Sequence, residues 1–504
     1  MLNKNLDDSK LRKLNELKEK GASLYPYSFD VTHHAKDLNQ KYGRLQAEEQ
    51  TKDKVAVAGR VMLKRVMGKA SFFHIQDETG KIQLYFQEEA LGKDNYELLA
   101  KKIDVGDILG ASGLIFKTRR GEITVKVLNY QILCKSLALM PEKFHGLKDI
   151  ELKYRKRYMD LTFNPEVREV FFKRSKMIKV IRDFLNQSGF LEVETPTLQT
   201  IYGGANAKPF VTHINTWDMK MYLSVSPELF LKRLLVGGFE KVFTICKNFR
   251  NEDVDTTHNP EFTMAEVYQA YVDYNKMMEL FEQICEKACL AINGSTKVKQ
   301  KYQGQEVELD FKTPWKRMTM FEAIKKYGDI DVANLSEKEI KKLVDNLNLE
   351  YEGTFSWGAG VQLLFEEFAE DKLIQPIHII DHPKETTPLC KLSRYDSRLV
   401  ERFESFCLGM EISNAYSELN DPVLQRERLE EQAKELRGGT KEAHPMDEDF
   451  VTAMEFGMPP AGGLGFGIDR IAVILTGQDA IRDVILFPTV KPVVEEEQKS
   501  EQRR

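Results

Sequence analysis

Phe249-Arg250-Asn251-Glu252, followed shortly by His258-Asn259-Pro260-Glu261-Phe262, is the stretch that decides how this chain is interpreted. Strand-like runs flank it, Lys241 to Phe249 and Phe262 to Tyr271, so it predicts a loop between two antiparallel strands. Arg250 and Glu252 would point to one face of extended backbone. An arginine grips phosphate or carboxylate through two hydrogen bonds, and a phenylalanine stacks on a base, so the loop suits a clamp for ATP. The alternative is a charged hairpin tip over a core phenylalanine.

A glycine-rich stretch lies far along the chain, Gly462-Gly463-Leu464-Gly465-Phe466-Gly467-Ile468-Asp469-Arg470. Its glycines at 463, 465 and 467 follow the period of a strand, so one strand face would be bare backbone that a flat ligand can approach closely. The apolar run Ile471 to Leu475 predicts a helix that ends near Gly477, with Arg470 in its first turn, where amide donors favour anions. This spacing differs from that of a dinucleotide-binding turn.

The two stretches together identify a family. FRNE…HNPEF resembles motif 2 of the class II aminoacyl-tRNA synthetases, and GLGFGIDR resembles their motif 3. Ser188 to Pro196, SGFLEVETP, resembles motif 1, which builds the dimer interface in that class, so a homodimer is expected. The resemblance runs from about residue 53 to 490 and is closest to the lysyl-tRNA synthetases. The class usually has Glu before the motif 3 arginine, whereas this chain has Asp469, which the lysine enzymes commonly carry.

The composition is that of a globular protein kept in a reducing compartment. The 504 residues are 42% hydrophobic and 30% charged, and no apolar run approaches the roughly 20 residues that span a bilayer. The polar N-terminus lacks the apolar core of a secretory signal. Of six cysteines only Cys285 and Cys289 are close together, and we interpret them as reduced interior residues in preference to a zinc site. We expect a cytoplasmic protein without a membrane segment.

The pattern of elements predicts an α+β chain. Five short alternating segments between Val55 and Leu128, with a helical stretch near Asn95 to Lys102, indicate an OB-type β-barrel. Helices mixed with strands and hairpins then indicate a large catalytic domain with an antiparallel sheet flanked by helices. The expected parts are an N-terminal helical extension at 1–52, an OB-fold anticodon-binding domain at 53–136, a linker at 137–164, a class II catalytic domain at 165–490 with an insertion at about 294–353, and a disordered tail at 491–504.

The barrel is the expected contact with tRNA. The formal net charge of the chain is −5, but fourteen basic against ten acidic residues give residues 53–135 a net charge of +4, a weak signal for phosphate binding. The resemblance places anticodon readers at Phe72, Gln83 and Glu122, which suits an aromatic face that stacks a base and polar groups that bond its edge. Strand alternation puts either Phe72 or the neighbouring Phe73 outside, without deciding which.

The resemblance also implies a reaction. The carboxylate of the amino acid attacks the α-phosphorus of ATP, and the adenylate is then attacked by the terminal ribose hydroxyl of tRNA. The protein would act by positioning and charge stabilisation. Arg250 would bridge the amino-acid carboxylate and the α-phosphate, while Arg470 and His258 would hold the β- and γ-phosphates. Phe262 would stack on adenine, with Arg470 near its other face, and Glu252 would orient the adenine amino group.

Glu404 and Glu411 match the carboxylates that hold Mg²⁺ in the family, and hard oxygen ligands suit a metal that bridges phosphates. From the residues alone, Glu404 is one of many helix-surface glutamates. Asn414, Tyr416 and Glu418 alternate onto one strand face, and Glu411 falls on the opposite parity. A bulge, or a position just before the regular strand, would be needed to bring Glu411 round.

A pocket for lysine needs carboxylate and phenol acceptors for its ammonium groups. Glu228 in Val225-Ser226-Pro227-Glu228-Leu229 matches the family's α-amino ligand, where the aspartate enzymes carry Gln, and Glu418 and Tyr268 match the ε-ammonium ligands. The expected lysine-binding residues are Gly204, Glu228, Arg250, Tyr268, Asn414, Tyr416 and Glu418.

Three other functions fit parts of this pattern. An aspartyl or asparaginyl enzyme shares the motifs but is disfavoured by the acidic pocket. A paralogue that lysylates a protein would lack the anticodon barrel that this sequence predicts. A non-catalytic nucleic-acid-binding protein with a decayed synthetase body is disfavoured because Arg250, His258, Phe262 and Arg470 are all present.

Overall fold

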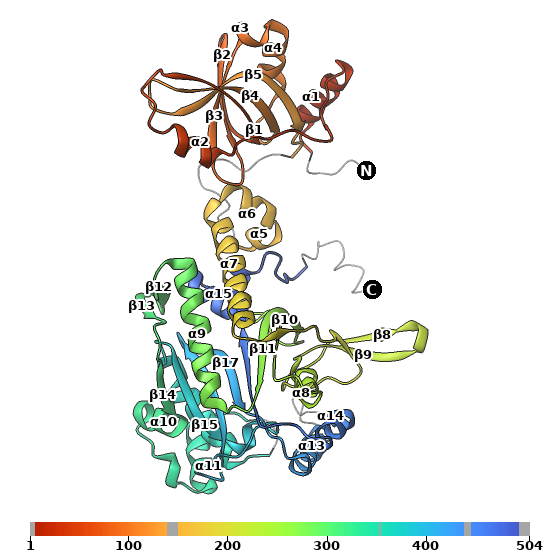
Figure 1. Cartoon of the computed structure of the whole chain (residues 1–504), viewed down its shortest axis with the longest axis vertical. Coiled ribbons are helices and arrows are strands. Elements are labelled where there is room, and N and C mark those ends of the chain that lie inside the picture. The colour runs from red at the N-terminus through yellow and green to blue at the C-terminus, as the bar shows by residue number, and fades with distance from the viewer. Residues whose placement is uncertain (1–5, 139–149, 352–353, 438–444, 493–504) are drawn as a thin grey trace. The chain divides into compact units, whose positions relative to one another are not determined.

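The structure is a computed structural model that describes residues 6–138, 150–351, 354–437 and 445–492. The chain divides into two compact units, Met1–Gly146 and Leu147–Arg504 (Figure 1). Residues 139–149 of the expected linker and 493–504 of the expected disordered tail lie outside the described residues.

The first unit contains a closed five-stranded barrel with strand order β1-β2-β3-β5-β4, as the alternating segments predicted. Its strands are β1 Gln50–Met67, β2 Ala70–Gln76, β3 Lys81–Gln87, β4 Ile108–Lys117 and β5 Ile123–Cys134. Alternation in β2 sends Phe73 into the barrel core, where it is fully buried, and leaves Phe72 half-buried on the outer side. The sequence did not decide which of the two phenylalanines lies on the outside of the barrel, and the structure shows that it is Phe72.

Four helices accompany the barrel: α1 Asp8–Glu19, α2 Ala35–Tyr42, α3 Glu88–Leu91 and α4 Lys93–Lys102. The helix α1 lies in the expected N-terminal helical extension, and its Leu14 and Leu17 are buried in the same apolar core as the barrel strands. Amphipathic spacing therefore serves packing here, because the apolar stripe of α1 faces the barrel.

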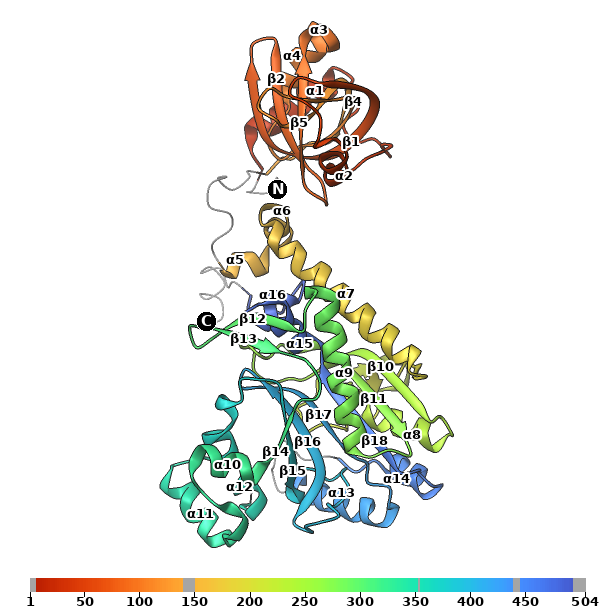
Figure 2. The ribbon, with the colours of Figure 1, turned by 60° about the vertical axis from the view of Figure 1, so that its left-hand side comes forward.

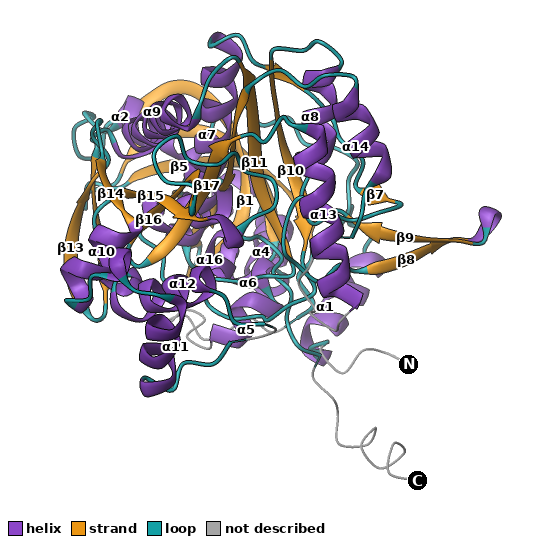
Figure 3. Ribbon diagram, turned by 90° about the horizontal axis from the view of Figure 1, so that it is seen from below, coloured by secondary structure: helices purple, strands orange, loops and turns teal. Residues whose placement is uncertain are grey.

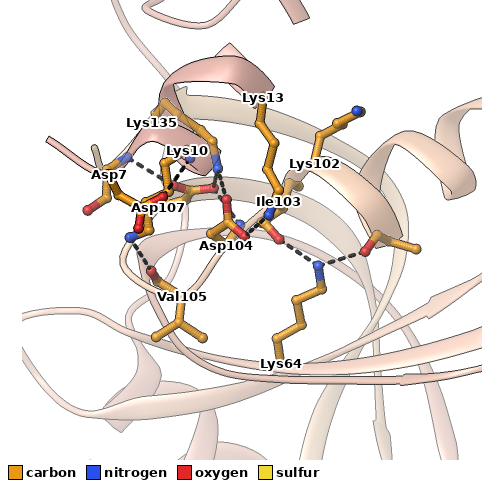
Figure 4. Close-up of polar contacts among 12 residues, drawn as sticks. Asp7, Lys10, Lys13, Lys64, Lys102, Ile103, Asp104, Val105, Asp107 and Lys135 are labelled. Atoms are coloured by element: carbon orange, nitrogen blue, oxygen red, sulfur yellow. Dashed lines mark hydrogen bonds and ion pairs between the residues drawn. The ribbon is translucent and has the colours of Figure 1, made fainter. Parts of the chain in front are cut away.

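A cluster of lysines and aspartates joins α1 to the barrel (Figure 4). The fully buried Nζ of Lys135 donates to Asp104 at 2.6 Å and to Asp107 at 2.7 Å. Lys13 of α1 donates to Asp104 at 2.6 Å, and Lys10 of the same helix donates to a backbone carbonyl at 2.8 Å. Buried ammonium groups need such acceptors, so the cluster fixes where α1 packs.

The second unit is built on an eight-stranded sheet with the order β14-β15-β16-β17-β18-β11-β10-β6. The strands are β6 Leu191–Glu192, β10 Lys241–Phe249, β11 Glu261–Ala270, β14 Lys316–Thr319, β15 Ile377–Pro383, β16 Leu399–Cys407, β17 Met410–Ser417 and β18 Ala461–Gly467. Neighbouring strands are antiparallel except for the outer pairs β6–β10 and β14–β15, which are parallel. The predicted α+β class is confirmed, and the sheet is antiparallel through its centre and mixed at its edges.

Helices cover both faces of the sheet. On one face α7 Pro165–Gln187, α9 Tyr274–Asn293 and α15 Ile468–Thr476 share a core with strand residues such as Phe243 and Val267 (Figure 2). On the other face α8 Glu228–Val236 packs on β10 and β11 and contacts α14 Glu448–Glu455, which contacts α13 Pro422–Arg437 (Figure 3). This second face carries the functional side chains described below.

Smaller elements surround the sheet. The hairpin of β8 Val211–Ile214 and β9 Met219–Leu223, joined to β7 Leu198–Gln199, projects from the body (Figures 1 and 3). The remaining helices near the ends of this unit are α5 Ile150–Arg155, α6 Arg157–Phe163 and α16 Ile481–Val484.

The region of the expected insertion holds a hairpin, β12 Lys297–Tyr302 with β13 Gln305–Asp310, and a helical cluster beside β14 and β15 (Figure 2). The cluster has its own apolar core and consists of α10 Met320–Gly328, α11 Glu337–Asn346 and α12 Trp357–Phe368. The helices α10 and α11 lie within the expected limits of the insertion. The helix α12 was not predicted, and it carries the cluster beyond the expected limit at residue 353.

Cys285 and Cys289 are fully buried in α9, as the interior interpretation requires, and burial raises the pKa of both thiols. All six cysteines are free thiols. Within the described ranges, no helix combines the length and the apolar character needed to cross a membrane.

Candidate active site

Strand pairing brings the two key sequence stretches together on one face of the sheet. Glu266 of β11 pairs with Gly465 of β18, which pairs with Asn414 of β17, which pairs with Glu404 of β16. Residues opposite each other in a sheet share a face, so this row of four residues, three with side chains and one bare glycine, comes from four strands. The floor of the site is therefore set by sheet register and not by any single loop.

A cavity of about 400 Å³ lies over this floor. Most of the residues expected from the sequence line it, which brings together positions more than 200 residues apart in the chain. The expected residues on its wall are Gly204, Glu228, Arg250, Glu252, His258, Phe262, Tyr268, Glu404, Glu411, Asn414, Tyr416 and Arg470. Glu418 lies behind this wall and is 1% exposed.

Arg470 and His258 meet at one end of the cavity. An Nη of Arg470 lies 3.3 Å from Nε2 of His258, and the other Nη donates to the carbonyl of Glu411 at 2.6 Å. The ring of His258 is held at its Nδ1 by Asp255, at 2.9 Å. Arg470 stands in the first turn of α15, where backbone amides add positive potential, so this end suits a polyphosphate.

Arg250 lies between the two ends of the site. Its guanidinium carbon is 5.2 Å from the centre of the Phe262 ring, so the arginine covers a face of that ring. Within the described part of the chain, the buried Nε of Arg250 has no hydrogen-bond partner. A buried donor without an acceptor is costly, so this N–H is suited to an anionic group of a ligand. Glu252 accepts the backbone N–H of Lys208 at 3.2 Å.

Asp469, the unusual residue of the glycine-rich stretch, ties that stretch to its neighbours. One carboxylate oxygen accepts from Arg174 of α7 at 2.5 Å, and the other accepts the backbone N–H of Thr263 at 2.7 Å. Asp469 is 1% exposed and therefore needs both partners. The contact fixes the start of α15, and with it Arg470, against β11.

Glu411 reaches the cavity through a β-bulge. Ser413 of β17 pairs with Ser405, but Glu411 pairs with Phe406, so Ile412 is an extra residue that reverses the alternation. This bulge turns Glu411 to the same face of the sheet as Asn414, which regular alternation along the strand would not allow. Glu404 is a strand residue in β16, so its interpretation from local sequence as a helix-surface glutamate is wrong.

Arg402 forms an ion pair with Glu404 and donates to Asn414 at 3.0 Å. Burial, together with the neighbouring Glu404, raises the pKa of Glu411. Glu404 is buried and Glu411 is partly exposed, and two neighbouring carboxylates that repel each other would be stabilised by a divalent cation, so this pair fits Mg²⁺. Among the described residues, no group of three or more metal-ligating side chains gathers around one point.

The opposite end of the cavity is acidic and rich in hydroxyl groups. Glu228 accepts from the Tyr416 hydroxyl at 2.5 Å. Glu266 accepts from the hydroxyls of Ser226, at 2.7 Å, and Tyr268, at 3.1 Å. Burial, followed by the negative charge of Glu228, raises the pKa of Glu266 to about 8. Within the described residues Glu266 is held by hydroxyl groups and not by an ion pair, so a cation placed here would meet a carboxylate without a counter-ion.

Two glycines let these acidic groups approach each other. Gly204 has a φ of +85°, and a Cβ there would meet the Ser226 hydroxyl oxygen at 2.8 Å. A Cβ on Gly463 would lie 1.9 Å from Oε1 of Glu418 and 2.5 Å from the ring of Tyr268. The bare strand face expected for a flat ligand is therefore filled at Gly463 by two side chains of the protein.

Comparison with known proteins agrees with this geometry. A family model described as tRNA synthetases class II (D, K and N) matches residues 149–491, and a model described as OB-fold nucleic acid binding domain matches residues 55–133. The chain belongs to the class II tRNA synthetases.

The relatives of this synthetase include three curated proteins named lysine–tRNA ligase. Identity is 51% with that of Pelotomaculum thermopropionicum, over 95% of this chain and 94% of the relative. It is 48% with that of Clostridium perfringens, over 95% of each chain. It is 47% with that of Methanoculleus marisnigri, over 97% of this chain and 95% of the relative.

The barrel of the synthetase groups the three expected anticodon readers on its outer side. Phe72 stacks on Tyr85, with ring centres 4.7 Å apart. Gln83 donates to Glu122 at 2.7 Å, and the other oxygen of Glu122 lies 2.6 Å from a ring nitrogen of His74. Gln83 and Glu122 thus bind each other, and His74 is a third member that the sequence interpretation did not include.

Two residues of the synthetase's amino-acid end were also missed. Glu266 shares a strand face with Tyr268, and this alternation was visible in the sequence. Lys232 stands four residues after Glu228 in α8, a spacing that puts both side chains on one helix face. A lysine surrounded by Leu229, Leu231 and Leu235 was the signal that its charge would be buried beside a partner.

Proposed function

We propose that this synthetase joins L-lysine to tRNA(Lys) in an ATP-dependent reaction that passes through lysyl-adenylate and releases AMP and pyrophosphate. The observation that carries the proposal is the acidic amino-acid end of the cavity, where Glu228 and Glu266 line the wall and Glu418 lies behind it. An aspartate or asparagine side chain would meet acceptors where it needs donors, so this end favours a cationic substrate. The relatives named lysine–tRNA ligase support the same substrate.

In the first step, the substrate carboxylate attacks the α-phosphorus of ATP and pyrophosphate leaves. Arg250 bridges the carboxylate and the α-phosphate and stabilises the charge that develops between them. Arg470 and His258 hold the β- and γ-phosphates of the leaving group. Phe262 stacks on adenine, and Glu252 orients the adenine amino group. In the second step the terminal ribose hydroxyl of tRNA attacks the carbonyl of the adenylate, and AMP leaves.

Lysine is held at both ends by groups of the acidic wall. Glu228 accepts from the α-ammonium group, with Gly204 and Asn414 beside it, and Glu418 with Tyr268 accepts from the ε-ammonium group. Tyr416 fixes Glu228 through the hydrogen bond at 2.5 Å. Rigid placement of the substrate supplies much of the rate enhancement, because the reacting atoms are brought together in advance.

Glu404 and Glu411 would hold Mg²⁺. When bound, the metal neutralises phosphate charge and so eases attack at the α-phosphorus. The repulsion between these two neighbouring carboxylates supports the assignment, since a metal with one or two carboxylate ligands and phosphate oxygens is a common arrangement.

We also propose a tRNA contact, an oligomeric state and a cellular compartment for this synthetase. The barrel binds the anticodon through Phe72, Gln83 and Glu122, and the part containing motif 1 forms a homodimer. The anticodon-binding domain spans residues 53–136 and the catalytic domain spans residues 165–490. The reaction takes place in a reducing cytoplasm.

Pyrophosphate exchange with each of the twenty amino acids tests the proposal. Exchange should depend on lysine, and exchange driven by aspartate or asparagine would replace it with the same-class alternative. Absence of exchange with every amino acid, in protein that binds tRNA, would favour a non-catalytic nucleic-acid-binding protein.

A further inference from the structure

A lysine of the protein itself lies at the acidic wall. Lys232 belongs to α8, is fully buried, and places its Nζ 2.6 Å from Oε1 of Glu228 and 2.5 Å from Oε2 of Glu418. The ring of Tyr416 lies 5.3 Å from the same nitrogen. A single internal ammonium group therefore joins the two carboxylates that stand at opposite ends of the expected substrate.

The ion pairs leave one oxygen of each carboxylate for other partners. Lys232 and the Tyr416 hydroxyl both use Oε1 of Glu228. Within the described ranges neither buried oxygen of Glu418 has a hydrogen-bond partner; Oε2 forms the ion pair with Lys232, and Oε1 has no such contact. This free oxygen stands against Gly463, a residue of the cavity wall that has no side chain to cover it. A buried carboxylate oxygen without a donor is costly, so it is suited to an ammonium group of a ligand.

We propose that Lys232 is a positioning residue that determines specificity in the lysine pocket: it takes one oxygen of Glu228 and one of Glu418 and leaves the others for the substrate. The inference rests on the proposed function. It assigns Lys232 a second effect through charge. Once the carboxylates are ionised, as lysine binding requires, Glu228, Glu266 and Glu418 together with the two cations, Lys232 and Arg250, give the amino-acid end a net charge of −1. Lysine with its two ammonium groups and one carboxylate carries +1, so the bound state is neutral.

Without the internal cation, the carboxylates would instead be neutralised by protons. Coulomb attraction at such short distances stays strong even with substantial screening, so loss of Lys232 favours proton uptake by its neighbours. A protonated carboxyl group accepts poorly from an ammonium group, and it tolerates an apolar side chain better. The titratable groups that face Glu418 are Glu228, Lys232, Glu266, Tyr268, Cys390 and Tyr416.

The test compares the full-length protein with Lys232→Met, which keeps the unbranched side chain up to the ε position and removes the charged nitrogen. Lysine-dependent pyrophosphate exchange is measured from pH 6 to 9, with L-norleucine, which lacks the ε-ammonium group, as competitor. At pH 7 the KM for lysine should rise at least tenfold, while kcat and the KM for ATP stay within about threefold. The preference for lysine over norleucine should fall at least tenfold, and the pH at which KM levels off should rise by one unit or more.

Lys276→Met is the matched control, because Lys276 is an exposed helix residue paired with Glu279 at 2.8 Å. It should leave all these values unchanged. An unchanged KM for lysine in Lys232→Met, or an equal loss of kcat and of the KM for both substrates, would overturn the inference. Failure of the proposed function would appear differently, as absence of lysine-dependent exchange in the unaltered chain.

If Lys232→Met does not fold, a charge-compensated variant tests the positioning role of Lys232. Lys232→Met with Glu418→Gln removes one charge of each sign from the buried cluster and should fold. Its pH profile should return toward that of the unaltered protein, but its KM for lysine should stay at least tenfold higher. Full recovery of that KM would mean that Lys232 and Glu418 only neutralise each other, which contradicts a positioning role.

Discussion

The affinity of the synthetase for lysine should increase with pH between about 6 and 8. Burial, together with nearby carboxylates, raises the pKa of Glu266 to about 8, and burial raises the pKa of Glu418 to about 8 despite the opposing effect of Lys232. Below that pH the substrate-free pocket holds a proton. An ammonium group of lysine favours the ionised carboxylate, so binding must displace the proton, and binding therefore strengthens as pH rises.

The size of the effect follows from the pKa. With one displaced proton and a pKa of about 8, roughly 3% of the pocket is deprotonated at pH 6.5 and about half at pH 8, so the KM for lysine should fall about fifteenfold between these values. Each pH unit well below the pKa corresponds to about 1.4 kcal/mol of binding free energy. Since Glu266 and Glu418 lie beside Glu228, the pKa values describe the cluster as a whole.

The assay is lysine-dependent pyrophosphate exchange at saturating ATP from pH 6 to 8.5, with isothermal titration calorimetry in buffers of different ionisation enthalpy. Calorimetry should register the release of close to one proton per bound lysine at pH 7. The KM for ATP serves as the internal control and should vary much less, because its binding end contains neither glutamate. A KM for lysine that is constant, or that rises with pH, would refute the titrating pocket.

Three further perturbations test the site and the barrel. Glu228→Gln should raise the KM for lysine strongly in pyrophosphate exchange and leave the KM for ATP nearly unchanged; an equal loss of both would contradict its role. Arg470→Ala should lower kcat/KM by about 100-fold, on the order of 3 kcal/mol, with an unaltered circular dichroism spectrum, and a loss below fivefold would exclude phosphate binding. Lys135→Met leaves the buried Asp107 without its cation, while Asp104 keeps Lys13, and should lower the free energy of unfolding of the barrel in urea by about 3–5 kcal/mol, whereas Lys101→Met, at an exposed pair with Glu97, should change it little.

Local periodicity predicted many of the strands and helices. The alternation of Phe262, Met264, Glu266 and Tyr268 indicated which side chains of β11 share a face, and the predicted end of a helix near Gly477 agrees with the end of α15. These features depend on neighbouring residues only, so a single sequence contains them. The helix α12 was missed because its glycines and aromatic residues have no clear helical signal, although tertiary packing buries it.

Features that depend on pairing between distant strands could not be predicted in the same way. The bulge at Ile412 is a property of the register between β16 and β17, and local sequence offered only the conflict in the parity of Glu411. The hydrogen bond between Gln83 and Glu122 joins two barrel strands, so neither residue alone revealed its partner. The resemblance supplied the candidate residues, and the register explains how they meet.

The acidic pocket links specificity to stability. An ordinary unfolded glutamate titrates near pH 4.5, so a folded-state pKa of about 8 means that the native chain binds more protons than the unfolded chain between these values. The contribution of Glu266 to stability is therefore greatest in acid and declines as pH rises toward 8. Lysine acts in the opposite direction, because its ammonium groups stabilise the ionised carboxylates and its binding free energy adds to that of folding. The pocket is thus least stable when empty and deprotonated, the state in which it attracts a cation most strongly. Lys232 lessens the cost of the empty, ionised pocket, since its internal positive charge offsets part of the repulsion among the carboxylates without occupying the oxygens left for the substrate.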